Sequence, residues 1–307
     1  MQHVTAFEDL RLDHPAYLTI GAFDGVHRGH QALIGAMVTE AHGAGCPAVV
    51  LTFLPHPSVV LRGRRLSFYL STPEEKAEYL SALGVDALVT HPFNTDVAAI
   101  QAGDFLERLV AYTRLRVLWC GKDFALGHNR EGNVEYLSGA GARLGFEVRV
   151  QTPVLIDGEI ISSTRIRQTL RDGAVEQAAR YLGRPFRVTG EVVEGAKRGR
   201  QLGIPTANVA VGDERATPAV GVYACRASHA GWRGPAVVNI GFRPTFEAVE
   251  PHPVIEAHLL DFSGDLYGQR LSLDFFHRLR PEMKFSGIDA LLAQIKQDIA
   301  QARTLLA

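Results

Sequence analysis

"AYLTIGAFDGVHRGHQALIGAMVTEAHGAG", residues 16–45, carries the clearest fold signal in the chain. Its apolar beginning, "AYLTIGAF", predicts a buried strand that ends at a glycine-containing turn. Apolar residues then recur at helical spacing from residue 30 to residue 45, where glycines end the pattern. A buried strand, a tight turn and a helix in this order are typical of a parallel α/β sheet.

Strands and helices continue to alternate through the first half of the chain. Apolar runs predict strands at 47–54, 85–90 and 115–121, and helical spacing predicts helices at 71–84 and 102–113. The helix at 71 has a strong start, with Thr72 as N-cap, Pro73 as first residue and Glu75 completing a capping box. The alternation predicts a parallel sheet with helices on both faces.

The second half of the chain has a different pattern. After residue 186 the helical spacing stops, and turns separate short β-type runs at 187–195, 221–228, 235–241, 254–262 and 270–279. These runs predict an antiparallel barrel or sandwich. The boundary is expected near Gly183–Pro185, which gives domains 1–184 and 185–307.

An amphipathic helix is expected at the end of the chain, over residues 286–307. Ser286 is the candidate N-cap of this helix. The apolar residues predicted to share one face are Ile288, Leu292, Ile295, Ile299 and Ala302.

Charge and cysteine content exclude several classes of protein. The 307 residues include 32 Lys and Arg against 33 Asp and Glu, so the charge gives no reason to expect nucleic acid or an anionic membrane as a partner. Cys46, Cys120 and Cys225 show neither zinc-site nor CxxC spacing and fit a reducing compartment. The sequence has no signal-peptide pattern and no bilayer-length apolar run. We therefore expect a cytoplasmic protein, a monomer or weak homo-oligomer.

His27 and His30 follow the first turn, three residues apart, at the start of the first predicted helix. A helix N-terminus at the carboxyl end of parallel strands offers backbone N–H groups and partial positive charge, and phosphates bind there. Two imidazoles at this position can hold nucleotide phosphates and stabilise a leaving pyrophosphate. Two alternatives stay open: a metal site, which needs a third ligand, and a pair of capping or surface histidines.

Two further stretches support phosphate binding in the first half. "ISSTRIRQTL", residues 161–170, places hydroxyls at a helix start and arginines just inside it, where they cap the helix and neutralise phosphate charge. These side chains are Ser162, Ser163, Thr164, Arg165 and Arg167. In "CGKDFALGH", residues 120–128, Asp123 is a candidate for holding magnesium or a sugar hydroxyl. The plainer alternatives are a solvated, capped helix and a turn aspartate.

The pairing of "GAFDGVHRGH" with "ISSTRIR" resembles the adenylyltransferase module of the bacterial bifunctional riboflavin kinase/FAD synthetases. The HxGH element alone is shared by many nucleotidyltransferases, whereas its pairing with ISSTRIR is far more specific. The resemblance implies a Rossmann-like domain that transfers an adenylyl group from ATP to FMN, with His27 and His30 as catalytic residues. The ATP-binding positions that it implies are Gly21, Phe23, Asp24, Gly29, Asp123, Ser162, Ser163, Thr164 and Arg165.

"GAKRGRQLGIPTANV", residues 195–209, is the chemical stretch of the second half. No Walker A sequence is present, but a flexible basic loop can approach phosphates, and a basic surface hairpin is the plainer alternative. After Pro205, Thr206 and Asn208 lie two residues apart on an extended segment and suit a magnesium–nucleotide complex. Glu256 interrupts an apolar strand, where a carboxylate is either a general base or a rim residue facing solvent.

The second half resembles riboflavin kinase over nearly its full length. The matching elements are "GIPTANV", "GVYA", "NIGFRPTF", "EAHLLDF", "GDLYG" and "FFHRLRPEMKF". The resemblance implies a six-stranded antiparallel barrel followed by a helix, with Glu256 as the base for the ribityl 5′-hydroxyl. It implies a flavin site at Arg280 and Phe285, and magnesium ligands at Thr206 and Asn208. The nucleotide positions are Gly195, Lys197, Gly199, Gly203, Pro205, Thr206 and Asn208.

Together the two halves imply an enzyme that phosphorylates riboflavin with ATP and Mg²⁺ and then adenylylates FMN, giving FAD and pyrophosphate. Flavins are thus substrates and products, and neither step needs a covalent intermediate. The first module departs from the family pattern at Leu54, where an acidic residue is frequent. It also departs at Ala125 and Leu126, where a basic or polar residue and an aromatic are frequent. Because of these departures, one alternative stays open: the protein is a riboflavin kinase whose first domain is degenerate. A second alternative is a non-catalytic flavin-binding regulator.

Overall fold

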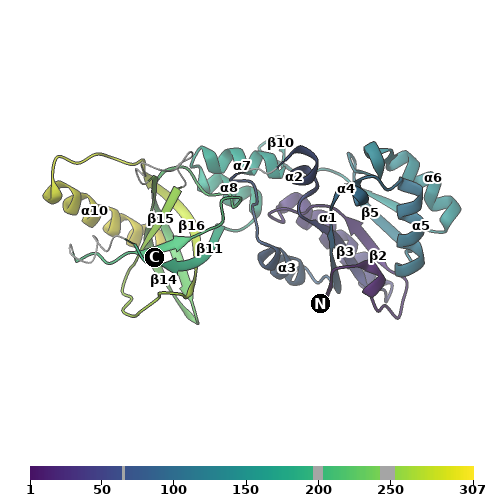
Figure 1. Ribbon diagram of the computed structural model, residues 1–307, viewed down its shortest axis with the longest axis horizontal. Coiled ribbons are helices and arrows are strands. Elements are labelled where there is room, and N and C mark those ends of the chain that lie inside the picture. The colour runs from purple at the N-terminus through teal and green to yellow at the C-terminus, as the bar shows by residue number, and fades with distance from the viewer. Residues whose placement is uncertain (64–65, 196–202, 243–252) are drawn as a thin grey trace. The chain divides into compact units, whose positions relative to one another are not determined.

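The structure is a computed structural model that describes residues 1–63, 66–195, 203–242 and 253–307. Packing divides the chain into two compact units. The first contains Met1–Arg65 and Tyr69–Ser163, and the second contains Leu66–Phe68 and Thr164–Ala307. Figure 1 shows the helices and strands and labels many of them.

The first unit is built on a six-stranded sheet in which every pairing is parallel, as the sequence predicts. The strands, in their order across the sheet, are β1 (Gln2–Val4), β4 (Ala87–Pro92), β3 (Ala48–Leu54), β2 (Tyr17–Ile20), β5 (Val117–Gly121) and β8 (Glu147–Gln151). The edge strands β1 and β8 have no counterpart in the sequence-based prediction. β1 has only 3 residues, and β8 alternates charged and apolar residues with little burial.

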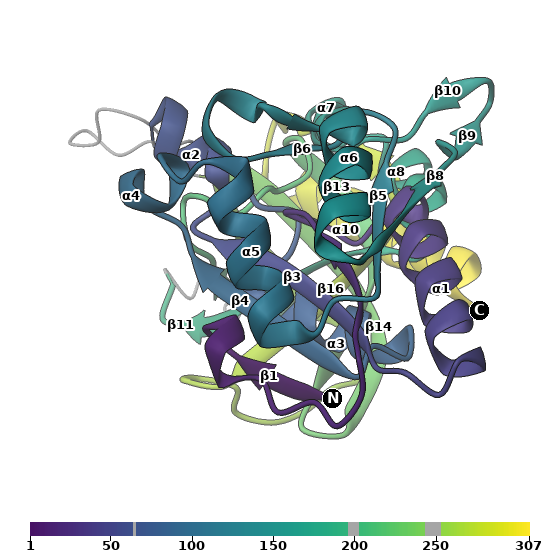
Figure 2. The same ribbon diagram turned by 90° about the vertical axis from the view of Figure 1, so that its right-hand side faces the viewer.

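Helices cover both faces of this sheet, as predicted. The helices are α1 (Arg28–Gly43), α2 (Pro57–Arg62), α3 (Pro73–Ala82), α4 (Thr95–Ala98), α5 (Ala102–Thr113) and α6 (Val134–Leu144). On one face, Leu106 of α5 and Leu137 of α6 share a core with Leu18. Figure 2 shows α5 crossing in front of β3 and β4. On the other face, Ile34 of α1 and Leu80 of α3 share a second core.

Local signals placed several elements of the first unit correctly. The capping box predicted at the start of α3 is present, because Thr72 Oγ1 accepts from Glu75 N and Glu75 Oε2 accepts from Thr72 N. Helix α5 has the bounds that its sequence pattern predicts. The short pieces that the pattern does not show are η1 (Phe7–Asp9), β6 (Ala125–Leu126), η2 (His128–Arg130), β7 (Gly132–Asn133), β9 (Leu155–Ile156) and β10 (Glu159–Ile160).

The second unit contains a closed six-stranded barrel in which every pairing is antiparallel. The strands, in order around the barrel, are β11 (Phe186–Val193), β12 (Ala207–Ala210), β15 (Pro253–Leu259), β14 (Trp232–Phe242), β13 (Gly221–His229) and β16 (Arg270–Arg280). The structure thus decides for a barrel over a sandwich.

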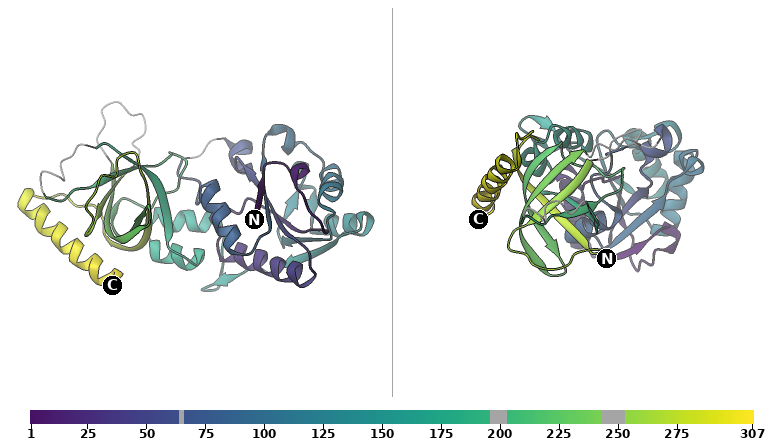
Figure 3. Two further views of the ribbon diagram at one scale, coloured as in Figure 1. Left: turned by 90° about the horizontal axis from the view of Figure 1, so that it is seen from below. Right: turned by 60° about the vertical axis from the view of Figure 1, so that its left-hand side comes forward.

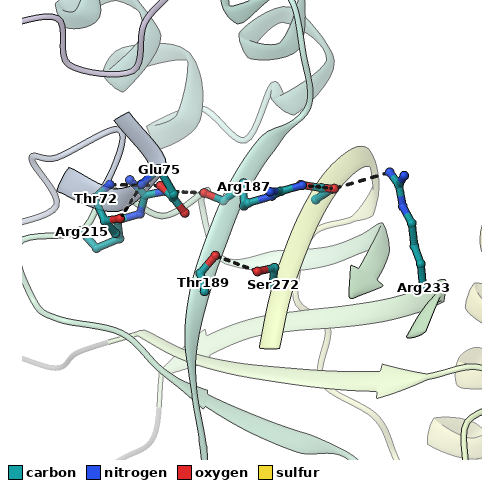
Figure 4. A network of polar contacts seen from close by, with 8 residues as sticks. Thr72, Glu75, Arg187, Thr189, Arg215, Arg233 and Ser272 are labelled. Carbon is teal, nitrogen blue, oxygen red and sulfur yellow. Dashed lines mark hydrogen bonds and ion pairs between the residues drawn. The ribbon is translucent and has the colours of Figure 1, made fainter. Parts of the chain in front are cut away.

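Polar side chains join β11 to β16, the pair that closes the barrel. Arg187 Nε and Nη2 donate to the two carboxylate oxygens of Asp274 at 2.7 and 3.0 Å, and Asp274 is 5% exposed. Arg233 Nη2 also lies 3.7 Å from this carboxylate. Figure 4 shows Thr189 facing Ser272, and their hydroxyl oxygens are 2.9 Å apart. Arg187 and Asp274 are direct partners in the register of the closing strands, so this bidentate charge pair strengthens their pairing.

The C-terminal helix α10 (Ile288–Leu306) packs against β13, β14 and β16. Figure 3 shows it, in yellow, along the outside of the barrel, where Ala302 and Leu306 are buried. Two details of the prediction are wrong. The helix begins after Gly287, so Ser286 stands one residue too early to be its N-cap. Ile288 is 61% exposed, so the buried face begins only after the first turn.

Helices α7 (Ser163–Arg171) and α8 (Val175–Leu182) pack with the barrel unit. Ala219 N donates to the Leu170 carbonyl at 2.9 Å, and Arg278 Nη1 donates to the Asp172 carbonyl at 3.1 Å. Packing therefore divides the chain between residues 163 and 164, after the first residue of α7. The expected boundary at Gly183–Pro185 instead coincides with the left-handed C-cap that ends α8. The assignment of functions to 1–184 and 185–307 stays a prediction.

Candidate active sites

The turn between β2 and α1 has an unusual backbone conformation. Phe23 and Val26 have positive φ angles of 46° and 37°, and Gly25 between them has a φ of 78°. Bulky and β-branched residues rarely adopt this region, and each such residue costs about 1–3 kcal/mol. The surrounding structure must therefore hold the turn in place.

The segment before α3 binds one side of this turn. Asp24 is 2% exposed, and its Oδ1 accepts from the backbone N of Leu70 at 2.9 Å and of Ser71 at 3.3 Å. The hydroxyl of Ser71 accepts in return from Gly25 N at 3.1 Å. The carboxylate of Asp24, which is predicted to bind nucleotide, thus also accepts the hydrogen bonds that attach the turn to the segment before α3.

Three more groups contact the turn's carbonyls. Lys76 Nζ and Thr52 Oγ1 donate to the carbonyl of Ala22, at 2.7 and 3.0 Å. Ser163 Oγ donates to the carbonyl of Asp24 at 2.9 Å. The first residue of α7 therefore meets the turn across 139 positions of sequence, as expected if the two motifs serve one site.

The two histidines lie against each other at the start of α1. His27 is the N-cap residue, and its Nδ1 accepts from the backbone N of His30 at 3.3 Å. The two rings are stacked with centroids 3.6 Å apart, and the ring of Phe23 meets His30 edge-on at 5.2 Å. The capping interpretation is thus correct for His27. Because its Nδ1 is an acceptor, a neutral His27 carries its proton on Nε2.

His30 is held in the neutral form by its surroundings. Burial, the neighbouring His27 and the charge of Lys76, in that order, hold the pKa of His30 well below its usual range. Within the described parts of the chain, the buried Nδ1 of His30 has no hydrogen-bond partner. A neutral imidazole at a helix N-terminus can donate to a phosphate oxygen without the desolvation cost of a buried cation.

Gly21 and Gly29, both predicted to face nucleotide, stand where aromatic rings approach the backbone. A Cβ on Gly29 would lie 3.1 Å from Cε1 of His27, and a Cβ on Gly21 would lie 2.8 Å from the ring of Phe23. Glycine at these positions therefore lets the rings of His27 and Phe23 settle against the turn.

The other predicted residues of the first half are placed as follows. Ser162 precedes α7, and Thr164 and Arg165 follow Ser163 on that helix and belong by packing to the second unit. Arg167 donates to the carbonyl of Phe68 at 2.6 Å and lies over its ring. Its guanidinium thus has a structural role that the sequence pattern did not suggest.

Asp123 and the residues that depart from the family pattern lie at the carboxyl ends of strands. Asp123 is exposed in the turn after β5, where its backbone carbonyl accepts from Arg130 Nη2 at 2.9 Å. In the structure's described residues its carboxylate has no hydrogen bond to the turn between β2 and α1, which we call the histidine turn. Leu54 ends β3 and is 40% exposed. Ala125 and Leu126 form β6, and Leu126 packs against the core.

A row of polar residues crosses three adjacent strands of the barrel. Asn208 on β12 pairs in register with Glu256 on β15, which pairs with Asn239 on β14. Ile255 and Ala257, on either side of Glu256, are fully buried, so the row faces outward. Residues directly opposite each other in such a ladder have Cβ atoms about 5 Å apart. The oxygens of the row therefore converge, and Thr206 precedes Asn208 on the same face.

Glu256 and Asn239 of this row line a pocket of about 340 Å³ on the outside of the barrel, beside α10. Its apolar lining consists of Ile204, Val222, Val237, Met283, Leu291 and Ile295. Its polar lining includes Thr206, Asn239, Glu256, Arg280, Glu282 and Asp298. An apolar slot with a few convergent polar groups suits a planar aromatic ligand that carries a polar chain. Phe285, predicted to bind flavin, also lines it.

Arg280 is fixed in this pocket by a carboxylate of α10. Arg280 Nε and Nη2 donate to Asp298 at 3.0 and 2.8 Å, and Gln294 Nε2 donates to the same carboxylate at 2.9 Å. Asp298 is 2% exposed, and the guanidinium lies 5.7 Å from the ring of Phe285. Asp298 was not predicted from the sequence, because helical spacing places it beside apolar residues and gives no sign of a partner on β16.

The basic loop before β12 is described only at its ends. Lys197 and Gly199 lie outside the described residues. Gly195 lets the side-chain amide of Asn208 approach the backbone, because a Cβ at residue 195 would overlap that amide. Gly203 has a φ of 75°, and the carbonyl of Pro205 accepts from Nδ1 of His258 at 2.8 Å.

Thr206 and Glu256 in this pocket, and Asn208 next to Glu256 in the sheet, offer oxygen ligands that suit magnesium carried by phosphates. In the described ranges no three His, Cys, Asp or Glu side chains are grouped to hold a metal ion, and this includes the histidine turn. Thr206 and Asn208 offer a hydroxyl and an amide oxygen, and Glu256 stands opposite Asn208. Mg²⁺ prefers such oxygen ligands together with substrate phosphates and water. None of the described helices is long and apolar enough to cross a membrane.

Comparisons with known proteins match both units. A family model described as FAD synthetase matches residues 10–165, and one described as riboflavin kinase matches residues 182–306. Curated relatives named bifunctional riboflavin kinase/FMN adenylyltransferase occur in several bacteria. The Pseudomonas fluorescens protein is 39% identical over 100% of this chain and 98% of its own length. The protein of Escherichia coli strain K12 is 38% identical over 93% of this chain and 91% of its own length.

A solved structure shares the fold over nearly the whole chain. It is titled a macrolide-efflux protein from Streptococcus pneumoniae, and it matches with a TM-score of 0.90 at 30% identity, covering 98% of both chains.

Proposed function

The chain belongs to the family of bifunctional riboflavin kinase/FMN adenylyltransferases, and we propose that its two reactions are divided between its two units. The second unit phosphorylates riboflavin, and the histidine turn of the first unit serves adenylyl transfer to FMN. The observation that carries this division is the outward row of Asn208, Glu256 and Asn239 beside an apolar pocket, far in sequence from the histidine turn.

In the kinase reaction, Glu256 accepts the proton of the riboflavin 5′-hydroxyl. The hydroxyl oxygen then forms a bond to the γ-phosphorus of ATP, the bond from that phosphorus to the β,γ-bridging oxygen breaks, and ADP leaves. Thr206 and Asn208 would hold Mg²⁺ with the phosphates, and the ion would supply neutralisation of their charge. Phosphoryl transfer depends mostly on positioning and electrostatics, which a fixed row of oxygens beside a flavin-sized slot provides.

In the adenylyl-transfer reaction, a phosphate oxygen of FMN attacks the α-phosphorus of ATP. The bond to the oxygen bridging to the β-phosphorus breaks, and pyrophosphate leaves. His27, His30 and the N-terminus of α1 stabilise the charge that develops on the leaving group. Ser163, Thr164 and Arg165 at the start of α7 would hold ATP phosphates. The enzyme acts in the cytoplasm on these small molecules.

A time course of flavin products tests this function. Purified protein is incubated with riboflavin, excess ATP and Mg²⁺, and the flavins are separated by chromatography. We expect FMN to rise first and then to give way to FAD. FMN that accumulates without FAD, even when FMN is supplied and pyrophosphate is removed, would contradict adenylyl transfer by the first unit. No conversion by folded, flavin-binding protein would contradict both activities.

We expect Asp298→Asn to raise the KM for riboflavin about tenfold and to leave FAD formation from supplied FMN unchanged. The variant removes the charge that pairs with Arg280, and the guanidinium of Arg280 then stands in a largely apolar pocket without its carboxylate partner. Breaking a buried ion pair costs about 3 kcal/mol, so urea unfolding of the barrel unit should also shift. Steady-state kinetics and urea titration measure both effects.

Asp261→Asn is the matched control for this variant. Asp261 also binds an arginine of α10, because Arg303 donates to its carboxylate at 2.7 and 2.8 Å. That pair is exposed, so its loss should change neither KM nor stability appreciably. Equal effects of the two variants would argue against a special role for the Arg280–Asp298 pair.

A further inference from the structure

Lys76 of helix α3 donates to a backbone carbonyl of the histidine turn. We propose that Lys76 is a positioning residue for adenylyl transfer, which fixes the turn before His27 and His30 by holding the carbonyl of Ala22. This inference rests on the proposed function of the first unit. Lys76 stands 54 positions from Ala22 in the sequence, within a segment that reads only as a well-capped helix.

The start of α3 gives Lys76 a fixed place. The capping box of Thr72 and Glu75 closes the first turn of the helix, and Lys76 N donates to the carbonyl of Thr72 at 2.9 Å. The side chain then reaches two oxygens, the Ala22 carbonyl at 2.7 Å and Thr52 Oγ1 at 3.2 Å. Thr52 itself donates to the same carbonyl. Two donors on one carbonyl fix the direction of that peptide group.

The fixed peptide group is the one that leads into the strained part of the turn. A peptide unit is planar, so holding the carbonyl of Ala22 also sets the plane from which Phe23 begins. Phe23 has a φ of 46°, and its ring meets His30 edge-on. A contact path therefore runs from Lys76 through Ala22 and Phe23 to His30. If the carbonyl is released, the strain at Phe23 favours relaxation of the turn, and the His30 imidazole moves with it.

Charge supports the same role. Burial lowers the pKa of Lys76, and the carboxylate of Asp24 acts in the opposite direction. Lys76 in turn is one of the groups that hold the pKa of His30 low. The titratable groups that interact with the charge of this lysine are thus Asp24 of the turn and His30 of α1. A solvated surface lysine would have neither two protein acceptors nor this influence on a buried imidazole.

Two substitutions separate the hydrogen bond from the bulk of the side chain. Lys76→Met keeps an unbranched chain but has no donor, and we expect it to lower kcat for FAD formation about 100-fold, the size of effect that a misplaced reacting group produces. The KM for FMN should stay unchanged, because the ammonium of Lys76 donates to the protein itself, at the Ala22 carbonyl and Thr52 Oγ1. Lys76→Gln keeps an N–H donor and should recover about tenfold of the lost kcat. Riboflavin phosphorylation by the same molecules should proceed at the wild-type rate.

The controls separate a positioning role of Lys76 from a purely structural one. They also separate failure of this proposal from failure of the proposed function of the histidine turn. Glu78→Gln, an exposed position on the same helix, should have wild-type kinetics. Wild-type kcat in Lys76→Met would overturn the proposal. The proposal would also be overturned if Lys76→Met lost kcat for FAD formation, Lys76→Gln did not recover it, and the loss came with a lower melting temperature and slower riboflavin phosphorylation. His30→Ala is assayed alongside. If it retains FAD formation, the proposed function of the turn fails; if it loses FAD formation while Lys76→Met does not, only the role of Lys76 fails.

Discussion

His30→Ala should lower the rate of FAD formation from FMN and ATP about 1000-fold, while riboflavin is still phosphorylated at the wild-type rate. The imidazole stacks on His27 and is enclosed by Phe23, so no neighbouring group can take its place. Removing a preorganised donor from a site of developing charge typically costs 100- to 1000-fold in rate. Initial rates of the two reactions, measured by chromatography of the flavins, test the expectation in a single preparation.

His42→Ala is the matched control on the same helix. His42 lies in the last turn of α1 and is 48% exposed, where it pairs with Asp86 at 2.8 Å. Its removal should leave both rates unchanged. If His30→Ala and His42→Ala were equally active, the imidazole would have no part in the chemistry. If His30→Ala lost both activities while folded, the division between the two units would be wrong.

Glu256→Gln should have the opposite effect. We expect FMN formation to fall about 1000-fold, within the range typical of a lost general base. FAD formation from supplied FMN should continue at the wild-type rate. The substitution keeps size and hydrogen-bonding capacity, so the row with Asn208 and Asn239 should keep its geometry and lose only the proton acceptor. Rates are measured separately with riboflavin and with FMN as the starting flavin.

Glu191→Gln controls for the loss of an acidic residue from the barrel. Glu191 is an exposed position on β11, opposite Ala210 and Arg270. Its substitution should change neither activity. Appreciable phosphorylation by Glu256→Gln would show that the carboxylate is a rim residue, the alternative that the sequence leaves open.

Local patterns predicted many elements of the fold, because these depend on neighbours in the chain, but they did not predict helix α6 or the edge strand β1. The capping box of α3 and the bounds of α5 were predicted from such local patterns. A barrel could be told from a sandwich only by the pairing of β11 with β16, which brings together residues such as Arg187 and Asp274, 87 positions apart. The edge strand β8 was missed because its charged, exposed residues do not give the apolar signal of a buried strand.

The candidate sites were predicted where motifs are contiguous and missed where residues act from a distance. His27, His30 and Glu256 stand in recognisable stretches, whereas Lys76 and Asp298 stand in helices whose patterns explain them as ordinary helical residues. Each becomes meaningful only through its partner, the Ala22 carbonyl for Lys76 and Arg280 for Asp298. A spacing pattern gives the face of a helix, but it does not say which backbone or side chain a polar residue on that face will meet.

The edges of the two sheets bear on how the protein resists aggregation. The closed barrel has no free edge strand among its described residues, whereas the six-stranded parallel sheet has two edges to which a strand of another molecule could add. One of its edges, β1, is too short to guide such pairing. The other, β8, carries Glu147 and Arg149, and Arg149 pairs with Glu147 at 2.7 Å and with Glu40 at 3.5 Å. Adding a strand there would disturb these solvated charges, so the edge of β8 opposes intermolecular β-sheet growth.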